Sequence, residues 1–403
     1  MKLQHKIYLP VLLTLLPFGV FAKTATPATK ARSHPPIPLE VSGWIPYWRT
    51  ATGTADAIAH IDSFTEVSPF GYTVRRDGTL FDAMHIDAGP WQTLVQTAHS
   101  HKVRVIPTVM WSNADAIDMI LRSPDLRKAH IKEIVQVVRV HGFDGIDIDY
   151  EAKKAATKNY FSLFLRDLYH AIGNKFVVCS IEPRTPLDSR FSEIPKSIQY
   201  ANDFTAINKY CDRVRIMAYD QGIIDLKLNA ATAGPYAPVA DPQWVEKVVR
   251  LAAKTIAKKK IVIGVPTYGY EFAVTPLTQG YMYKLKWALD PKYGLNLAGE
   301  FGLTPQRNTA GELSFRYVPT TTSATPDSGN ALSSNNTLAT TTAIIAPTAA
   351  TSTISNAPFR LVWWSDAHAV RDKVLLAKKL GVRGIAIFKI DGGEDPAIWS
   401  MLK

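Results

Sequence analysis

Cysteine is scarce in this sequence, with only Cys179 and Cys211 among 403 residues. Two cysteines are too few for the disulfide framework that stabilises small secreted scaffolds. One disulfide is compatible with export, but we expect both residues to be buried free thiols. Stability must then come from a hydrophobic core, and a chain of this length with 46% hydrophobic residues can build one.

Long uninterrupted apolar runs are also missing. Residues 9–20 are apolar, but Pro10 and Pro17 interrupt them and the run is shorter than the ~18 residues that a membrane span needs. Two lysines precede this run and small residues end it at Ala22, which is the order of a secretory signal peptide. We therefore predict a signal peptide at 1–22, a flexible leader rich in Pro, Thr and Ala at 23–40, and a secreted protein (extracellular, periplasmic or attached to the cell wall) without stable membrane insertion.

Acidic residues are outnumbered by basic ones, 35 against 46, and the formal net charge is +11. The predicted signal peptide holds two lysines and no acid, so the mature chain would carry about +9. Such a charge draws a secreted protein toward anionic cell-wall polymers. No nucleic-acid-binding motif accompanies the lysines, so nucleic acid is not an expected partner. Nothing in the sequence indicates the oligomeric state.

From residue 41 onward, short apolar runs alternate with helix-like stretches such as 123–142 and 366–382, which begin at a capping Ser or Asp and end near a Gly. This alternation predicts parallel βα units in an α/β protein. A (β/α)₈ TIM barrel is the simplest closure. An open doubly wound sheet is the alternative, but the Gly-rich loop that it needs after its first strand is absent. The eight runs are 41–48, 63–72, 103–111, 145–151, 175–183, 213–220, 260–270 and 384–391.

One segment departs from the alternation. Residues 319–358 consist mainly of Thr, Ser, Ala, Asn and Pro, and Asp327 is their only charged residue. Such a composition buries too little apolar surface to fold by itself. Because the segment lies between the seventh and eighth runs, we predict a disordered tract inside an insertion at about 273–360, within a barrel that extends over 41–403.

The stretch "DGIDIDYE" (144–151) places four carboxylates in an expected buried strand. Side chains alternate across a strand, so Asp147, Asp149 and Glu151 share one face and the isoleucines share the other. In a barrel these acids would point inward and rise toward the C-terminal end of the strand, where barrel enzymes carry their catalytic groups. Asp144 has the opposite parity and begins the strand, so we expect a structural role for it.

Clustered buried carboxylates must be protonated or paired, and neighbouring like charges raise the pKa of one member. The result is a carboxylic acid that can donate a proton near neutral pH beside an ionised carboxylate, which is the division of roles in glycoside hydrolysis. A calcium-binding loop does not fit, because the sixth and twelfth positions counted from Asp147 are Ala152 and Lys158.

Two motifs resemble those of glycoside hydrolase family 18, the chitinases and their relatives. "DGIDIDYE" resembles the signature DGxDxDxE, and "MAYD" (217–220) resembles the M-x-Y-D motif that ends the sixth strand in that family. The resemblance implies retaining, substrate-assisted hydrolysis of β-linked N-acetylglucosamine polymers such as peptidoglycan or chitin, with no metal or cofactor. The segments 361–367 and 388–399 look most like the bacterial cell-wall and spore-associated branch.

The resemblance also implies roles for individual residues. Glu151 would protonate the leaving oxygen and later activate water, and Asp149 would orient the substrate's acetamido group. Asp147 would share a proton with Asp149, Tyr219 would bind the acetamido oxygen, and Asp220 would help to hold the sugar. The other substrate contacts that we expect are Met217, Phe388, Trp111, Tyr268 and Tyr47.

The sequence also departs from the chitinase pattern. Phe388 stands where the family usually has the tryptophan beneath the catalytic sugar, and Glu182 adds an acid where small or apolar residues are usual. Two other functions therefore stay open. One is a sugar-binding lectin with little or no turnover, although such lectins typically lose the acid that Glu151 retains. The other is an endo-β-N-acetylglucosaminidase that acts on N-glycans.

Overall fold

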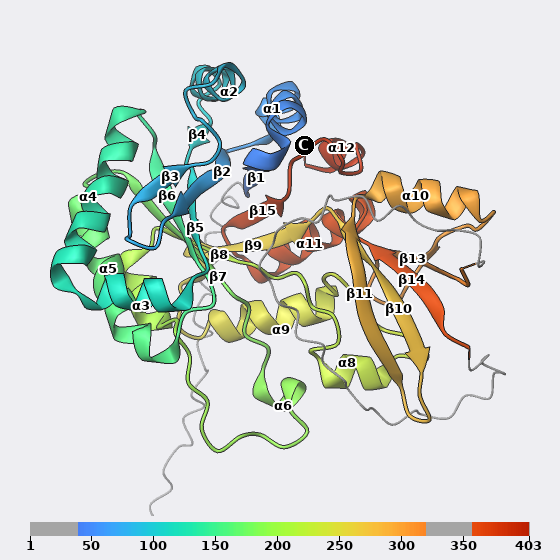
Figure 1. The fold of residues 1–403 in the computed structure, drawn as a ribbon. Helices are drawn as coiled ribbons and strands as arrows, with labels where there is room; N and C mark the ends of the chain where they lie inside the picture. The colour runs from blue at the N-terminus through green and yellow to red at the C-terminus, as the bar shows by residue number, and fades with distance from the viewer. Residues whose placement is uncertain (1–38, 320–356, 403) are drawn as a thin grey trace, which may run out of the picture. The chain divides into compact units, whose positions relative to one another are not determined.

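Eight parallel strands close into a barrel in the computed structural model, which describes residues 39–319 and 357–402 (Figure 1). The predicted α/β barrel is confirmed. Strand β1 pairs with β15 on one side and with β2 on the other, and this closure makes the open-sheet alternative wrong. The barrel strands are β1 (Glu40–Pro46), β2 (Glu66–Val74), β5 (Thr108–Trp111), β6 (Gly145–Tyr150), β7 (Phe176–Ile181), β8 (Arg213–Ile216), β9 (Ile261–Pro266) and β15 (Gly384–Phe388). Two short strands, β3 (Leu80–Asp82) and β4 (Arg104–Val105), pair with β2.

Helices connect the barrel strands and begin where the sequence signals placed them. The Ser123 hydroxyl accepts the Leu126 N–H at the start of α4, and Gly381 ends α11 with a positive φ of 65°. None of the described helices is long and apolar enough to cross a membrane. The helices are α1 (Thr50–Ala59), α2 (Gly89–Ser100), α3 (Ala114–Arg122), α4 (Pro124–Val140), α5 (Lys158–Ala171), α6 (Leu187–Arg190), α7 (Phe204–Tyr210), α8 (Leu226–Ala231), α9 (Pro242–Ala252), α11 (Ala367–Leu380) and α12 (Ile398–Met401).

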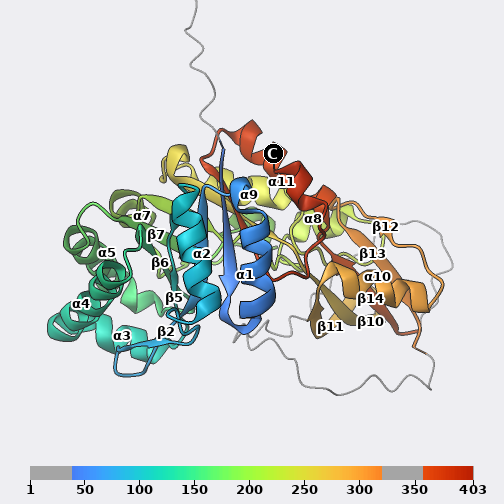
Figure 2. The ribbon, with the colours of Figure 1, turned by 90° about the horizontal axis from the view of Figure 1, so that it is seen from above.

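A second, antiparallel sheet follows β9 in the chain and lies beside the barrel in both views (Figures 1 and 2). It extends from Gly269 to Trp364, so it begins and ends four residues outside the predicted insertion of about 273–360. Helix α10 (Pro291–Glu300) packs on it, and Trp364 and Phe315 lie in the small core between them. The strands are, in spatial order, β11 (Tyr281–Leu289), β10 (Gly269–Pro276), β14 (Phe359–Trp364), β13 (Leu313–Tyr317) and β12 (Gln306–Arg307).

Several predicted segments fall outside the described residues. These are the whole signal peptide, the leader up to residue 38, and residues 320–356 of the Thr/Ser-rich tract. The leader prediction ends one residue late, because Glu40 is already the first residue of β1.

The two cysteines are joined, so the expectation of free thiols is wrong. Cys179 in β7 and Cys211 after α7 form a disulfide, with their Cα atoms 6.0 Å apart. Strands β7 and β8 are neighbours, and Cys179 pairs in register with Val214. This pairing brings Cys211, three residues earlier in the chain, beside β7. A separation of 32 residues in the sequence gives no sign of that proximity.

Candidate active site

The acids of β6 rise through the barrel interior toward its C-terminal rim. Asp147 is fully buried, Asp149 is 3% exposed, and Glu151 is the first residue beyond the strand. The Glu151 N–H donates to the Trp111 carbonyl at 2.8 Å, which extends the ladder with β5 by one step. Ala152 then turns the chain away with a φ of 52°. The Glu151 carboxyl group therefore lies at the mouth of the barrel.

Asp147 is surrounded by hydrogen-bond donors. Its Oδ2 accepts from Trp44 Nε1 at 2.9 Å, Thr108 Oγ1 at 2.9 Å and Arg215 Nη1 at 2.8 Å, and its Oδ1 accepts from Ser180 Oγ at 2.9 Å. An indole N–H and a guanidinium can only donate. Asp147 Oδ2 therefore acts only as a hydrogen-bond acceptor. Its basic partner, Arg215 in β8, was not predicted from the sequence.

Arg215 itself is buried between two carboxylates. Besides Asp147 it bonds the carboxylate of Glu66 and the hydroxyl of Ser68, and its guanidinium lies 4.8 Å from the centre of the Trp44 ring. Burial by itself would lower the pKa of Arg215, but the charges of Asp147 and Glu66 raise it above the usual range. The middle of the barrel thus holds an acid–arginine–acid triad instead of aliphatic side chains.

Asp149 occupies the next level of the barrel. Among the described residues, its Oδ1 atom is buried without a hydrogen-bond partner. Burial raises the pKa of Asp149 well above its usual range, and the charges of Glu151, Asp147 and Glu182 raise it further. This environment therefore favours the protonated form of Asp149. Met110 pairs in register with Asp149, so its side chain faces the same level of the interior.

Glu151 has the pKa of a proton donor. Burial and then the charge of Glu182 raise the pKa of Glu151 to about 7, and Asp220 adds to the effect while Lys153 opposes it. This value matches the requirement that a general acid titrate near the working pH. Among the described residues, no side-chain group bonds the Glu151 carboxyl, which leaves it free to reach a substrate oxygen.

Glu182, the neighbour of Glu151, is an unusual acid in the sequence and was not among the predicted site residues. It follows β7, its Oε1 accepts the Ala152 N–H at 3.2 Å, and its Oε2 accepts from Asn202 Nδ2 at 2.6 Å. Lys153, almost fully buried, places its Nζ 3.8 Å from Glu182 Oε1. Glu182 is thereby anchored beside Glu151. An acid directly after a barrel strand was the signal that pointed to this position.

Tyr219 and Phe388 form a stacked pair at the rim. Their ring centres are 5.5 Å apart and their planes differ by 16°. Gly264 in β9 makes room for the Tyr219 ring, because a Cβ atom there would lie 2.8 Å from Tyr219 Cε1. The structure thus brings the predicted residues Tyr219 and Phe388 together. Met217 is partly buried in the same strand end, where its N–H donates to the Ile181 carbonyl at 3.0 Å.

Asp220 is held by two phenols. Its Oδ1 accepts hydrogen bonds from the hydroxyls of Tyr268 and Tyr270, each at 2.5 Å. Burial still raises the pKa of Asp220 above its usual range, although both hydrogen bonds oppose the shift. Tyr268 was predicted as a stacking surface for sugar, and its position gives it a second role in fixing Asp220. Tyr270 was not among the predicted site residues.

Other aromatic rings continue from Phe388 along the mouth of the barrel. The Phe388 ring lies 6.1 Å from Phe70, which contacts Trp48 at 5.8 Å, and Trp48 contacts the predicted site residue Tyr47 at 5.1 Å. Trp48 is 38% exposed. These rings offer flat apolar surface to a sugar chain.

Trp111 is not brought together with the other predicted residues. It pairs in register with Tyr150, on the face of the sheet opposite Asp149, and is 3% exposed. Its ring contacts Tyr150 at 5.4 Å and His130 at 5.5 Å. The alternation of side chains along β5 explains this position, because Met110 takes the inward place and Trp111 points to the helix layer.

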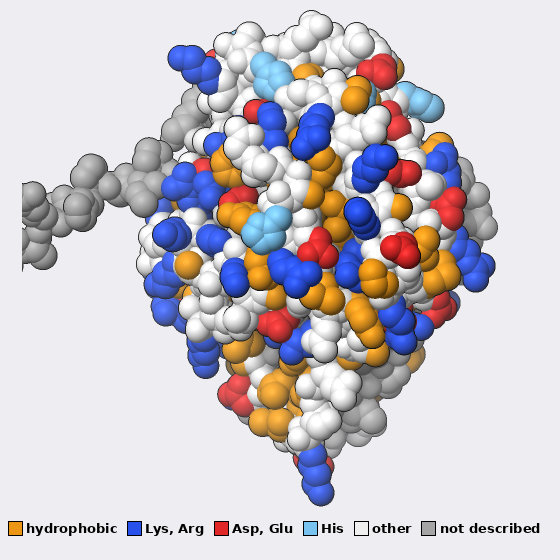
Figure 3. Space-filling view, turned by 90° about the vertical axis from the view of Figure 1, so that its left-hand side faces the viewer, with side chains coloured by type: hydrophobic (Ala, Val, Ile, Leu, Met, Phe, Trp, Pro, Cys, Tyr) orange, Lys and Arg blue, Asp and Glu red, His pale blue; other side chains and the backbone are white. Residues whose placement is uncertain are grey.

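On the face shown in Figure 3, Lys and Arg side chains are scattered among hydrophobic and neutral ones instead of gathering in one patch. Within residues 39–319 and 357–402, no group of three or more His, Cys, Asp or Glu side chains is arranged to hold a metal ion.

Comparison with known proteins agrees with these motifs. The family model described as Glycosyl hydrolases family 18 matches residues 44–393. The chain is similar to "Uncharacterized glycosylase YvbX" of Bacillus subtilis (strain 168), with 23% identity over 293 residues that make up 72% of this chain and 70% of that protein. It is also similar to the "Cortical fragment-lytic enzyme" of the same organism, with 24% identity over 348 residues that make up 84% and 67% of the two chains.

A solved structure shares the fold. The spore cortex-lytic enzyme SleL of Bacillus cereus is similar with a TM-score of 0.65 and 20% sequence identity, over 90% of this chain and 73% of that one. At such low identity the likeness establishes the common barrel and not a common substrate.

Proposed function

The chain belongs to family 18 of the glycosyl hydrolases and is a glycosidase, and from this premise we propose that it cleaves β-linked N-acetylglucosamine polymers, with peptidoglycan ahead of chitin. The mechanism that we propose is retaining and substrate-assisted, with acid–base catalysis by Glu151.

One observation carries the proposal. Glu151 lies at the C-terminal rim with a pKa of about 7, beside Asp149, whose pKa burial raises strongly. A protonated carboxyl group at this position can transfer its proton to a glycosidic oxygen as the bond breaks. The nearby Tyr219 and Asp220 supply polar groups for the sugar, and Phe388 supplies a ring surface.

The proposed reaction has two steps. In the first, the Glu151 O–H gives its proton to the glycosidic oxygen, the acetamido carbonyl oxygen of the substrate forms a bond to the anomeric carbon, and the leaving sugar departs as an alcohol. Asp149 accepts a hydrogen bond from the acetamido N–H, and Tyr219 donates one to the acetamido oxygen. In the second step, the Glu151 carboxylate takes a proton from water as the water oxygen attacks the anomeric carbon and the acetamido oxygen leaves. Two displacements at one carbon retain its configuration.

Peptidoglycan is favoured as the polymer by two considerations. Both the similar Bacillus subtilis protein and the SleL structure are called cortex-lytic or cortical fragment-lytic, and the spore cortex is made of peptidoglycan. The net charge of the chain, +11 with the N-terminal segment included, suits an anionic wall. We further propose that residues 1–22 direct export, which a comparison of cell and medium fractions for chains with and without this segment would test.

Product analysis by mass spectrometry tests the proposal. Purified peptidoglycan and, separately, chitin oligosaccharides are incubated with the wild type, with Glu151→Gln, and with Glu193→Gln, an exposed acid in the segment after β7, as a matched control. We expect new N-acetylglucosamine reducing ends from the wild type and the control but not from Glu151→Gln. Binding of sugar without cleavage by all three would instead indicate the lectin function, and release of whole N-glycans from a glycoprotein would indicate the endo-acting alternative.

A further inference from the structure

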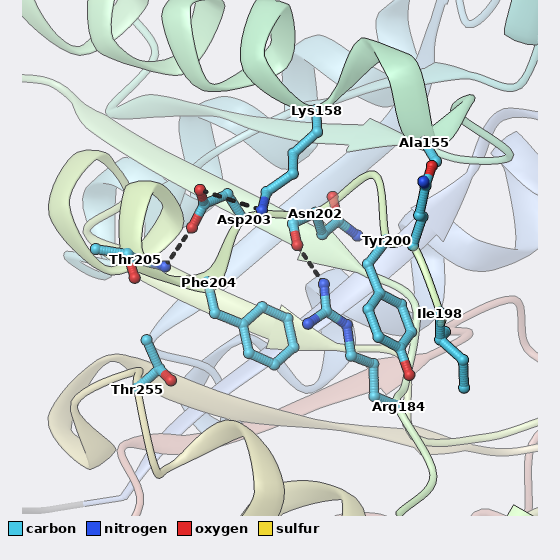
Figure 4. Close-up of a pocket in the computed structure, with 11 residues that line it drawn as sticks. Ala155, Lys158, Arg184, Ile198, Tyr200, Asn202, Asp203, Phe204, Thr205 and Thr255 are labelled. Carbon is cyan, nitrogen blue, oxygen red and sulfur yellow. Dashed lines mark hydrogen bonds and ion pairs between the residues drawn. The ribbon is translucent and has the colours of Figure 1, made fainter. Parts of the chain in front are cut away.

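The segment between β7 and α7 encloses a cavity that the proposed catalytic steps do not use. Its volume is about 390 Å³, and it opens between this segment and the start of α5 (Figure 4). Its wall includes the amide side chain of Asn202 and the charged or aromatic side chains of Lys158, Arg184, Tyr200, Asp203 and Phe204.

Arg184 is fixed in place at this cavity. Its guanidinium carbon lies 3.9 Å from the centre of the Tyr200 ring and 3.8 Å from the centre of the Phe204 ring, and Figure 4 shows the side chain between these two rings. One of its N–H groups donates to the Asn202 carbonyl oxygen. A guanidinium has five N–H donors. Arg184 is therefore held rigidly while most of its hydrogen-bonding capacity is unused.

The other charges of the cavity compensate each other. Lys158 Nζ lies 3.8 Å from Asp203 Oδ2, and Asp203 Oδ1 accepts the Thr205 N–H at 2.9 Å. Arg184, by contrast, forms no ion pair with any residue that the structure describes. Burial lowers the pKa of Arg184 below its usual range, but a guanidinium stays charged at any physiological pH. Glu182 and Asp203 act on Arg184 only through their charges, so the cavity holds a cation without a direct carboxylate partner among the described residues.

The cavity is linked to the proposed proton donor through one side chain. Asn202 lines the cavity and donates from Nδ2 to Glu182 Oε2 at 2.6 Å. Glu182 in turn binds the Ala152 N–H, one residue beyond Glu151, and its charge acts on both Glu151 and Arg184. Two hydrogen bonds through Glu182 thus connect the wall of the cavity to the backbone next to Glu151.

We propose that this cavity binds a carboxylate of the substrate, through Arg184. The inference rests on the proposed function, because peptidoglycan carries such groups on the lactyl ethers that bear no peptide and on its attached peptides, whereas chitin carries none. A planar guanidinium matches a carboxylate with two parallel hydrogen bonds. The cavity would thus make the enzyme selective for acidic glycan over neutral glycan.

Binding in an inactive background tests this site without turnover. The probes are soluble peptidoglycan strands with their peptides removed, the same strands with peptides attached, and chitin oligosaccharides. Their dissociation constants are measured calorimetrically for Glu151→Gln, and for Glu151→Gln combined with Arg184→Met, Arg184→Lys or Arg190→Met. Arg190 is the matched control, because it is exposed, lies on the same segment and stacks on Phe191 at 5.2 Å.

We expect Arg184→Met to weaken binding of the carboxylated strands by about tenfold or more, as loss of a charged hydrogen-bond donor should. Arg184→Lys should recover part of the affinity, and chitin oligosaccharides should bind within about twofold in every variant. A loss only on strands without peptides identifies the free lactyl carboxylate, a loss only on strands with peptides identifies a peptide carboxylate, and a loss on both kinds of strand shows that the site accepts either carboxylate.

Three results would overturn the site: equal losses for acidic and neutral glycan, no loss for either, or no binding of any carboxylated strand. These outcomes differ from a failure of the proposed function. If the active protein cuts neither polymer but strand binding still depends on Arg184, hydrolysis is refuted and the carboxylate site stands.

Discussion

Arg215 Nη1 lies 2.8 Å from Asp147 Oδ2 at the centre of the barrel. The levels of the interior above and below this pair are also polar. Arg213 precedes Arg215 by two residues on β8, so it also faces inward, and it bonds Glu40 in β1. Asp149 occupies the level above Asp147. Most barrels fill these layers with branched aliphatic side chains. Here, paired charges replace them directly beneath the candidate catalytic groups.

Replacing Arg215 with Met should destabilise the fold strongly. The variant leaves the Asp147 carboxylate buried without its cation and leaves Glu66 with Arg104 alone, and loss of one member of a buried pair costs about 3–5 kcal/mol. Urea unfolding monitored by circular dichroism measures the change in free energy. Arg250→Met removes an exposed arginine from an i,i+4 pair with Glu246 and should cost less than about 1 kcal/mol. Equal costs for the two variants would contradict the importance of the buried triad.

Glu182→Gln should move the high-pH limb of the activity profile to lower pH. A general acid works in its protonated form, so kcat/KM should fall above the Glu151 pKa of about 7. The negative charge of Glu182 favours protonated Glu151, and its removal therefore lowers that pKa. Initial rates between pH 4 and 9 on one soluble substrate give both profiles. Glu193→Gln, an exposed change in the same segment, should leave the limb where it is. If the high-pH limb also stays in place in Glu182→Gln, the charge of Glu182 does not set the pKa of Glu151.

Tyr219→Phe should reduce turnover without weakening the fold. Among the described residues, the Tyr219 hydroxyl has no hydrogen-bond partner, while its ring packs on Phe388. Removing one hydrogen bond to developing charge in a transition state typically costs a factor of about 10²–10³ in kcat. Steady-state kinetics and the thermal midpoint separate activity from stability. Tyr169→Phe, on the half-buried tyrosine of α5, should change neither quantity, and an unchanged kcat in Tyr219→Phe would remove Tyr219 from the mechanism.

Reduction of the disulfide should destabilise the protein. The bond between Cys179 and Cys211 closes a loop with a sequence separation of 32, and the chain-entropy model assigns about 3–4 kcal/mol to a loop of this length. The thermal midpoint should fall in the presence of a reductant that can reach the bond after unfolding. The double variant Cys179→Ala, Cys211→Ala should have a lower thermal midpoint than the oxidised wild type, and the reductant should not change that midpoint. Two alkylatable thiols in the unreduced, denatured wild type would show that the bond is absent.

Acid should weaken the barrel through Glu40. Burial by itself would raise the Glu40 pKa, but Arg213, Arg383 and Arg104 lower it to about 2 in the folded state. A lowered pKa stabilises the fold fully above the unfolded value near 4.5, and this contribution is lost as the pH falls from there toward 2. Urea midpoints at pH 7 and pH 3 for the wild type and Glu40→Gln test this. The variant should be less stable at pH 7 and should lose less between the two pH values. A parallel decline in both proteins would assign the acid sensitivity to other groups.

The sequence by itself determined the features that depend on local order. The alternation of runs and helices predicted the barrel, parity within β6 put Asp147 and Asp149 on one face, and a Ser cap and a Gly stop marked the ends of helices. The motif at 144–151 indicated glycoside hydrolase family 18, and the match of the family model to residues 44–393 confirmed this family. All of these are relations between residues close in the chain, where backbone geometry is regular.

Only the tertiary structure decided which distant residues meet. It paired Arg215 with Asp147 across 68 positions, joined Cys179 to Cys211, and placed Glu182 beside Glu151. It also turned Trp111 away from the interior, because the register of β5 against β6 sets which residue faces inward. Strand register and barrel closure arise from the packing of the whole chain, and no short stretch of sequence encodes them.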